Sequence, residues 1–283
     1  MPGVPPIRYQ SADEDSARWL DFTFRPGDIV ISTRSKSGTT WVQMICALLI
    51  FQTPDLPAPL ADLSPWLDWL ITPADVVFTR LDAQEHRRFI KTHTPLDGIV
   101  VDPRATYIVV ARDPLDAAVS LYHQSANMNR DRPAALPPLH EWLCSWIDWE
   151  GSPQEQMDSL PGVMWHLSDA WARRDQANIV LVHYDDLLGD LNGQMQRLAD
   201  LLGIAVDNDM WDQLVHAARF DQMRAQASRA IPTPGGILKD QSRFFRQGTS
   251  GEGRQVLSHD EVTRYRNRVN GMAPPELVTW LQR

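Results

Sequence analysis

Four short β-prone runs, separated by helical patterns, constrain the fold of this 283-residue chain more than any other feature. These runs are rich in β-branched and aromatic side chains and lie at residues 28–32, 88–93, 106–110 and 178–184. Apolar residues with helical spacing follow at residues 39–51, 115–123 and 193–202. Strands that alternate with helices favour parallel βαβ units. The sequence therefore predicts an α/β fold, a three-layer sandwich with a central, mainly parallel sheet, in a single domain over residues 1–283.

Polar residues and proline gather where these runs end. The second run is followed by Thr94 and Pro95, and the third by Arg112, Asp113 and Pro114. Asp113 is a suitable N-cap and Pro114 a suitable first residue for the next helix. In open α/β sheets, ligands bind at the carboxyl ends of the strands. We therefore expect the functional site at this edge of the sheet.

Two further kinds of segment stand out. Residues 225–253 contain several prolines and glycines, which predicts a long loop that closes over a ligand. Tryptophans cluster at residues 66–69 and 142–146. Such clusters are typical of helix packing, and an apolar acceptor pocket is the alternative.

Composition and charge exclude several classes of protein. The chain is 43% hydrophobic and carries a formal net charge of −9, which argues against a protein that coats nucleic acid. Its first residues do not resemble a secretory signal, and no apolar segment is long enough to cross a bilayer. The two cysteines, Cys46 and Cys144, do not form a disulfide framework. These features predict a cytoplasmic protein without stable membrane insertion.

Residues 36–40, which read Lys-Ser-Gly-Thr-Thr, lie between the first predicted strand and its helix. Such a loop offers backbone N–H groups, hydroxyl donors and one cation at the positive end of a helix, so it predicts an anion site. The Walker A motif places Gly-Lys directly before Ser or Thr. Here Lys36 precedes Gly38, which weakens the interpretation as a magnesium-dependent nucleotide triphosphate site.

The run from Lys36 to Trp41 resembles the 5′-phosphosulfate loop of cytosolic sulfotransferases, Pro-Lys-Ser-Gly-Thr-Thr-Trp. Ser35 replaces the proline, which we expect to loosen the entry to the loop. The resemblance implies that Lys36 and the loop amides hold the sulfate and 5′-phosphate of 3′-phosphoadenosine 5′-phosphosulfate (PAPS). It also implies that Trp41 stacks on the adenine.

Two segments that follow extend the resemblance. Residues 107–123 are similar to the family's 3′-phosphate-binding strand and helix, with Arg112 as a bidentate phosphate ligand and Ser120 as a hydroxyl donor. Residues 91–93 resemble its Lys-Thr-His segment, which implies that His93 is the catalytic base. By the same resemblance, Lys91 supports the transferring group and Ser120 steers Lys36.

Later matches complete the implied nucleotide site. Tyr184 resembles the tyrosine that approaches the adenine, whereas Ala218 replaces a threonine, which puts one adenine hydrogen bond in doubt. Arg246 would clamp the 3′-phosphate, and Gln247 lacks the charge of the family's lysine. The residues implied to contact the nucleotide are Lys36, Ser37, Gly38, Thr39, Thr40, Trp41, Arg112, Ser120, Tyr184, Phe220, Met223, Phe244, Phe245, Arg246, Gln247 and Gly248. Residues 251–254 are a degraded Gly-Asp-Trp-Lys, and the dimerisation motif of animal members is absent, so the oligomeric state stays open.

The predicted reaction transfers a sulfuryl group from PAPS to a hydroxyl acceptor, releases adenosine 3′,5′-bisphosphate (PAP) and needs no metal. We find no cysteine and histidine cluster with zinc-site spacing. The acceptor is expected to be a small apolar molecule, a phenol, alcohol or glycolipid, held by residues 53–77, 124–149 and 225–236. Two alternatives are a small-molecule kinase with a variant phosphate loop and a non-catalytic nucleotide-binding module.

Overall fold

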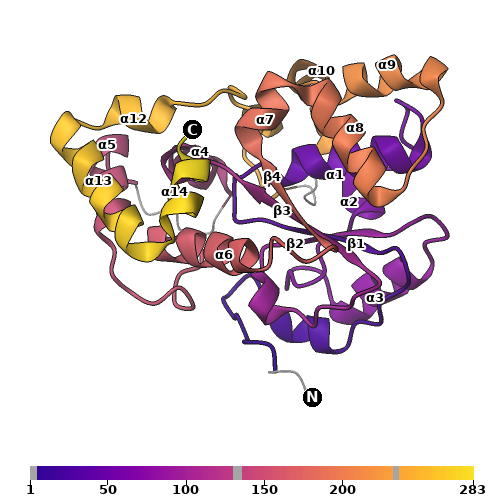
Figure 1. Ribbon diagram of the computed structural model, residues 1–283, viewed down its shortest axis with the longest axis horizontal. Helices are drawn as coiled ribbons and strands as arrows, with labels where there is room; N and C mark the ends of the chain where they lie inside the picture. Colours follow the sequence, from indigo (N-terminus) through magenta and orange to yellow (C-terminus); the bar gives the residue numbers. More distant parts are fainter. Residues whose placement is uncertain (1–4, 130–135, 232–235) are drawn as a thin grey trace.

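A computed structural model describes residues 5–129, 136–231 and 236–283 (Figure 1). Its sheet has four strands, β1 (Ile29–Ser32), β2 (Phe89–Thr92), β3 (Thr106–Ala111) and β4 (Ile179–His183), in the order β2-β1-β3-β4. Every pairing is parallel, and β1 lies between β2 and β3, with Ile31 opposite Lys91 and Ile108. The predicted strands are therefore confirmed to within about a residue at either end.

Helices cover both faces of the sheet. The α-helices of the described residues are α1 (Thr39–Phe51), α2 (Leu60–Leu63), α3 (Ala74–Asp82), α4 (Pro114–Asn127), α5 (Leu139–Asp148), α6 (Leu160–Ala172), α7 (Tyr184–Gly189), α8 (Leu191–Leu202), α9 (Asn208–Ala217), α10 (Phe220–Ala225), α11 (Ala227–Ala230), α12 (Glu252–Val256), α13 (His259–Met272) and α14 (Pro275–Leu281). Short 3₁₀ turns are η1 (Ser16–Leu20), η2 (Leu96–Gly98) and η3 (Gln241–Arg243).

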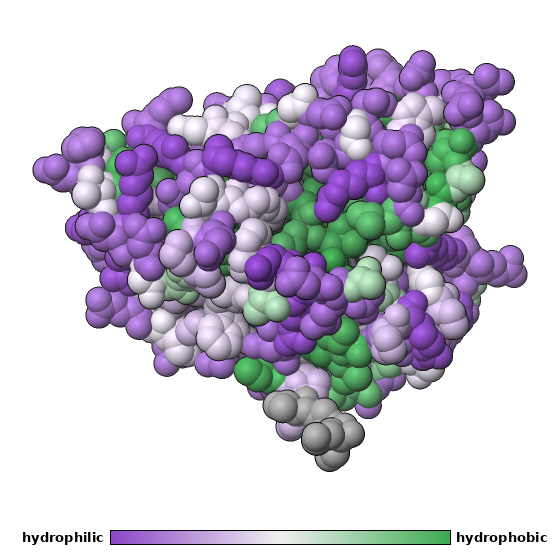
Figure 2. Space-filling view, in the orientation of Figure 1, coloured by the Kyte–Doolittle hydropathy of each residue, from purple (hydrophilic) through white to green (hydrophobic). Residues whose placement is uncertain are grey.

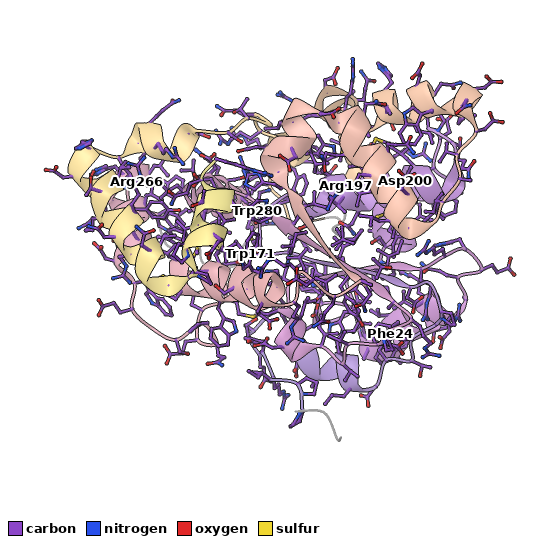
Figure 3. The ribbon with its side chains drawn as sticks, viewed as in Figure 1. Phe24, Trp171, Arg197, Asp200, Arg266 and Trp280 are labelled. Atoms are coloured by element: carbon purple, nitrogen blue, oxygen red, sulfur yellow. The ribbon has the colours of Figure 1, made fainter. Side chains whose placement is uncertain are left out.

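Alternate side chains of the strands divide the core into two clusters. Ile29 and Ile31 of β1 face the cluster that contains α1 and α8, whereas Val30 faces the cluster that contains α4, α6 and α13. The second cluster continues to the C-terminus, where Trp171 of α6 packs on Trp280 of α14 with ring centroids 5.4 Å apart (Figure 3). This arrangement is the predicted three-layer α/β sandwich.

Local sequence fixes the helices that matter for the site. The Asp113 side chain accepts a hydrogen bond from the N–H of Leu115, and Pro114 occupies the first turn of α4, as predicted. Helix α1 begins at Thr39, directly after Gly38 in a left-handed conformation. The first turns of α1 and α4 thus start beside the carboxyl ends of β1 and β3.

Two expectations from the sequence are corrected. Trp66 and Trp69 lie on an irregular segment rather than a helix, with stacked rings 4.7 Å apart, because the backbone of Trp66 forms a bridge with Lys91 of β2. Trp142 and Trp146 do pack from a helix, α5. The predicted loop at 225–253 is not wholly irregular, because it contains α11 and η3. Residues 232–235 of this loop and residues 130–135 of the predicted acceptor segments lie outside the described residues.

The surface seen in Figure 2 is largely hydrophilic, with apolar side chains in a band near its middle and a smaller patch below. Within residues 5–129, 136–231 and 236–283, no helix is long and apolar enough to cross a membrane. The expected cytoplasmic location stays a prediction.

Candidate active site

The loop between β1 and α1 has the strained backbone of an anion cradle. Lys36 (φ 66°) and Gly38 (φ 107°) both adopt left-handed conformations, which are uncommon for a residue with a side chain such as lysine. A Cβ at position 38 would lie 3.0 Å from the ring of Tyr184, so only glycine fits without a shift. The turn therefore presents its N–H groups and the N-terminus of α1 to one side, where an anion would bind.

Asp158 holds the entry to this loop. Its carboxylate accepts hydrogen bonds from Ser35 Oγ (2.8 Å) and the Ser35 N–H (3.3 Å) and forms a 2.7 Å ion pair with buried Arg34. A proline at position 35 could donate neither of the Ser35 bonds. These two hydrogen bonds restrain Ser35, so they act against the expected loosening of the loop entry.

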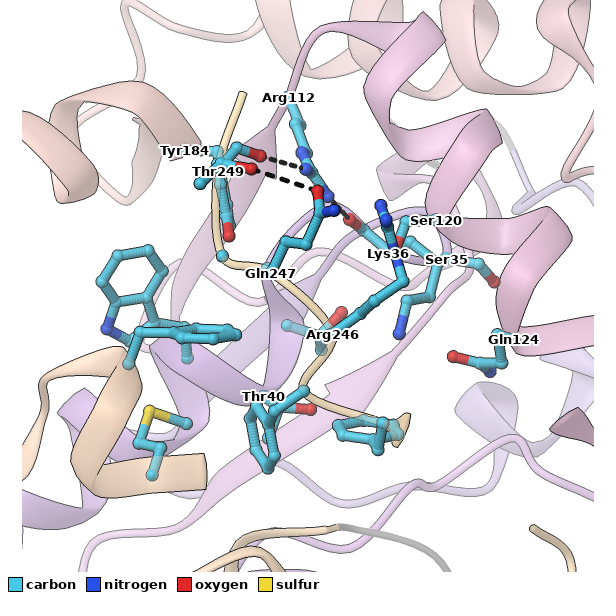
Figure 4. Close-up of a pocket in the computed structure, with 18 of the residues that line it drawn as sticks. Ser35, Lys36, Thr40, Arg112, Ser120, Gln124, Tyr184, Arg246, Gln247 and Thr249 are labelled. Atoms are coloured by element: carbon cyan, nitrogen blue, oxygen red, sulfur yellow. Dashed lines mark hydrogen bonds between the residues drawn. The ribbon is translucent and has the colours of Figure 1, made fainter. Parts of the chain in front are cut away.

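One pocket collects the predicted site residues at the carboxyl edge of the sheet (Figure 4). Among the residues predicted individually as catalytic or nucleotide-contacting, only Ser37 does not line it, being buried within the loop. The other predicted residues all line it: Lys36, Gly38, Thr39, Thr40, Trp41, Lys91, His93, Arg112, Ser120, Tyr184, Phe220, Met223, Phe244, Phe245, Arg246, Gln247 and Gly248. Trp66 and Gln124 of the predicted acceptor segments 53–77 and 124–149 line it too, together with Ser35 and Thr249, which were not predicted as site residues.

Both pocket lysines lie against aromatic rings. The Lys36 ammonium lies 4.4 Å from the ring centre of Phe244, and the Lys91 ammonium lies 3.7 Å from that of Trp66. Burial, reinforced by Arg112 and the other cations of the pocket, lowers the pKa of Lys36 to about 7. Burial also lowers the pKa of Lys91 to about 8, although the carboxylates of Glu14 and Asp68 act in the opposite direction. No carboxylate of the described residues forms an ion pair with Lys36, and this condition favours a bound anion there.

The two pocket arginines are held in different ways. Arg112 donates to the backbone oxygens of Lys36 (3.2 Å) and Thr249 (2.8 Å), as Figure 4 shows, and its guanidinium covers the ring of Tyr184 at 4.4 Å. Arg246 instead makes a two-point ion pair with Glu252, one bond being 2.8 Å long. The Nε of each arginine is buried without a partner in the described part of the chain. These unused donors fit a phosphate or sulfate group.

His93 is buried and fixed in one orientation. Its Nδ1 bonds to the backbone oxygen of Thr33, so Nδ1 carries the proton and the lone pair of Nε2 is free to accept one. The imidazole meets the ring of Trp66 edge-to-face at 4.6 Å. Burial, together with Lys91 and Arg34, holds its pKa well below 6.5. A neutral imidazole with one free lone pair can act as a general base at neutral pH.

Aromatic residues form the walls at one end of the pocket. The indole N–H of Trp41 donates to the backbone oxygen of Ala218 (2.8 Å), and its ring meets Tyr184 edge-to-face at 5.4 Å. The carbonyl of Ala218 thus orients this tryptophan, although its side chain lacks a hydroxyl. Gly248 (φ 67°) passes so close to Phe220 that a Cβ would lie 2.6 Å from its ring. Flat aromatic walls of this kind suit a nucleobase.

Residues 244–254, which we call the strap, cross over the pocket and are tied to α4. Asp116 accepts hydrogen bonds from the N–H groups of Gly251 (2.7 Å) and Gly253 (2.8 Å), and Arg254 pairs with Asp113 at 2.9 Å. A Cβ on Gly253 would lie 2.5 Å from Leu115. Gly253 of this degraded segment therefore permits close docking on α4. Sequence analysis missed Asp116 because its partners lie more than a hundred residues away.

Comparison with known proteins decides what this arrangement is. The sequence profile of the sulfotransferase domain matches residues 26–270. A glycolipid sulfotransferase from Mycobacterium bovis is 43% identical, over 97% of this chain and 93% of its own length. The chain belongs to the sulfotransferase family. Rat sulfotransferase 1A1 is a more distant relative of this sulfotransferase, 25% identical over 93% of this chain and 89% of its own.

Solved structures agree with this assignment at the level of the fold. Mouse sulfotransferase SULT7A1, crystallised with PAP, superimposes on this sulfotransferase with a TM-score of 0.71 at 20% identity, over 96% of this chain and 94% of its own. Retinol dehydratase, crystallised with androsterone and PAP, gives a TM-score of 0.68 at 18% identity, over 95% and 90% of the two chains. The predicted sulfotransferase class is confirmed, and the alternative of a small-molecule kinase is not supported.

Proposed function

We propose that this sulfotransferase uses PAPS as its donor and transfers the sulfuryl group to a hydroxyl of a largely apolar acceptor. One observation carries the proposal: the anion cradle, four cationic side chains and a neutral histidine all line one pocket. The relatives support the donor, since the mouse and retinol dehydratase structures contain PAP.

Particular residues fit each part of this donor. The turn at Lys36 and Gly38 suits the sulfate and 5′-phosphate, and Arg112, Ser120 and Arg246 suit the 3′-phosphate. Trp41 and Tyr184 offer flat surfaces for the adenine. When bound, PAPS supplies the sulfuryl group, which leaves the 5′-phosphate oxygen and forms a bond to the acceptor oxygen.

The protein's side chains then act on protons and charge. His93 accepts the acceptor's hydroxyl proton at Nε2, while its Nδ1–H stays bonded to Thr33. Protonated Lys36 balances the negative charge that develops on the leaving oxygen, and Lys91 faces the same space from β2. Placing these cations in a buried pocket strengthens their effect, because water does not screen them.

The acceptor is proposed to be a glycolipid or a similar apolar alcohol. Trp66 and Phe244 give the pocket apolar walls beside His93 and Lys36. Two mycobacterial relatives, each 43% identical, are named glycolipid sulfotransferases. A hydroxyl carried on an apolar body would reach His93 while the body rests on these rings.

Transfer of labelled sulfate from PAPS tests the proposal directly. Purified protein is offered a glycolipid, a sterol and a simple phenol, and the glycolipid is expected to give the highest kcat/KM. EDTA should leave the rate unchanged, because Lys36, Lys91 and the arginines supply the positive charge. Absence of transfer to every hydroxyl acceptor, in a protein that still binds PAP, would refute the proposal.

Substitution of His93 tests the assignment of the base. His93→Ala should lower turnover about 10²–10⁴-fold and leave the Kd for PAP nearly unchanged, because the imidazole acts on the acceptor proton. His123 is the next candidate for the base, because it lies in a smaller adjoining cavity beside Ser120, and His123→Ala is the matched control. Melting curves exclude a folding defect. If His123→Ala were inactive and His93→Ala were not, the assignment would be wrong.

A further inference from the structure

A group of metal-ligand side chains lies between α5 and α13, at the edge of the molecule (Figure 1). His140 and Cys144 stand one helical turn apart on the same face of α5, a pair that the search for zinc-site spacing in the sequence did not identify. Glu261 comes from the first turn of α13, 117 residues further along the chain than Cys144. None of the three lines the pocket described above.

The separations between their donor atoms match those of a single metal ion. Glu261 Oε1 lies 3.1 Å from His140 Nε2 and 3.3 Å from Cys144 Sγ, and Sγ lies 3.9 Å from Nε2. Usual zinc–ligand bond lengths in a tetrahedron imply ligand–ligand distances of about 3.4–3.6 Å. Small side-chain movements, of a few tenths of an ångström, would therefore bring all three atoms onto one ion.

We propose that His140, Cys144 and Glu261 bind Zn²⁺ or a similar divalent transition-metal ion, with water in the fourth position. Thiolate and imidazole ligands favour such ions over Mg²⁺ and Ca²⁺, which prefer oxygen. On binding, the thiol S–H bond breaks, a sulfur–metal bond forms and the proton passes to solvent. The ion links α5 to α13 and takes no part in sulfuryl transfer.

The carboxylate of Glu261 is already oriented for this role. In the capping box of α13, the Ser258 N–H donates to Glu261 Oε2 at 2.8 Å. This bond leaves Oε1, the oxygen nearest Cys144, available to the metal. Hydrogen bonds to a ligating carboxylate are the usual outer support of a metal site. Nearby Arg264 is paired with Asp148 at 3.2 Å, so its charge is partly balanced.

Cobalt binding to untagged protein tests the proposal. One equivalent of Co²⁺ should give a sulfur-to-cobalt charge-transfer band, because Cys144 would bind the ion as a thiolate. The band can be assigned to Cys144, since Cys46, the other thiol, is fully buried in the core. Cys144→Ser should abolish that band and weaken Co²⁺ affinity at least about tenfold. Glu261→Gln keeps a capping-box residue and should also weaken binding. A band that persists in Cys144→Ser, or no band in the parent, overturns the proposal.

A second measurement follows the reactivity of Cys144 in the parent protein and in a variant at the exposed position 140. In the parent protein, Zn²⁺ should slow the reaction of Cys144 with a thiol reagent, because the metal-bound sulfur is shielded. His140→Ala removes an exposed ligand, so the protein should fold normally, and the slowing should disappear. Equal slowing in His140→Ala would show that the ion binds elsewhere and would overturn the three-ligand site. Sulfuryl transfer in the parent should proceed equally with and without Zn²⁺.

Discussion

The loop between β1 and α1 and the strap both bring cations to the pocket, but they hold them differently. Lys36 sits in a turn that is anchored between a buried strand and a buried helix, and no carboxylate pairs with it among the described residues. Arg246 of the strap is paired with Glu252, a residue of the strap itself. Lys36 of the loop can therefore bind an anion without losing another partner, whereas Arg246 of the strap must exchange the carboxylate of Glu252 for the phosphate of the ligand.

This difference has a physical origin. Asp158 fixes the entry to the loop through Arg34 and Ser35, with contacts made entirely within the protein. The strap is tied down through Asp116, and the side chain of Arg246 remains free to change partners. We expect substitution of Lys36 in the loop to weaken catalysis and binding together, and substitution of Arg246 in the strap to change binding of the 3′-phosphate alone.

Among substitutions in the loop and the strap, Lys36→Ala should have the largest effect, because it removes the charge that faces the leaving oxygen. We expect turnover to fall about 10²–10³-fold, with weaker binding of PAP as well. Steady-state kinetics and calorimetry measure the two effects. Lys239 lies outside the pocket, and Lys239→Ala should behave like the parent. If Lys36→Ala changed neither quantity, the loop would not be the donor site.

Arg246→Ala should weaken PAP binding about 10–100-fold, the usual value for hydrogen bonds to a charged group. AMP, which lacks the 3′-phosphate, should bind the variant and the parent equally, and the parent should prefer PAP to AMP strongly. Calorimetry with both nucleotides measures the contrast. Equal losses for the two nucleotides would place Arg246 at the 5′ side and erase the distinction between loop and strap.

The pH dependence of PAP binding should sharpen the comparison. Since the pKa of Lys36 is about 7 in the free protein, Lys36 is charged below that pH and loses its proton above it. An anion favours the charged form, so affinity should fall as the pH rises from 7 to 9, by up to about tenfold per unit. Lys91, with a pKa of about 8, adds to the fall at the upper end. In Lys36→Ala the decrease in PAP affinity that begins near pH 7 should disappear. If the affinity of this variant still fell from pH 7, Lys36 would not be the source of the decrease.

Glu252→Gln should have the smallest effect, in the opposite direction. The amide no longer competes with the phosphate for Arg246, so PAP should bind a few-fold more tightly. Exposed Arg266 of α13 lies away from the pocket, and Arg266→Ala gives a surface control (Figure 3). Weaker binding in Glu252→Gln would mean that Glu252 positions Arg246 instead of neutralising it.

The sequence predicted the frame of the site because the necessary signals are local. Residues 29–51 contain a strand, the run from Lys36 to Trp41 and a helix in direct succession. The apolar spacing and the position of the glycine can therefore be read from adjacent residues. The same holds for Asp113 and Pro114 at the start of α4. The segment around Trp66 was misjudged because its tryptophan spacing also suits a helix, and only its pairing with Lys91 shows otherwise.

By itself, then, the sequence determined the α/β order of elements, the anion loop with Lys36 and the sulfotransferase resemblance, all of which depend on neighbouring residues. The tertiary structure alone decided the contacts that join distant segments: Asp158 on Ser35, Asp116 on the strap and Glu261 beside Cys144. It also decided the neutral state of His93, since burial and nearby cations set that pKa. Folding of the chain creates both the short distances between these distant segments and the burial of His93, and neither can be read from any one position of the sequence.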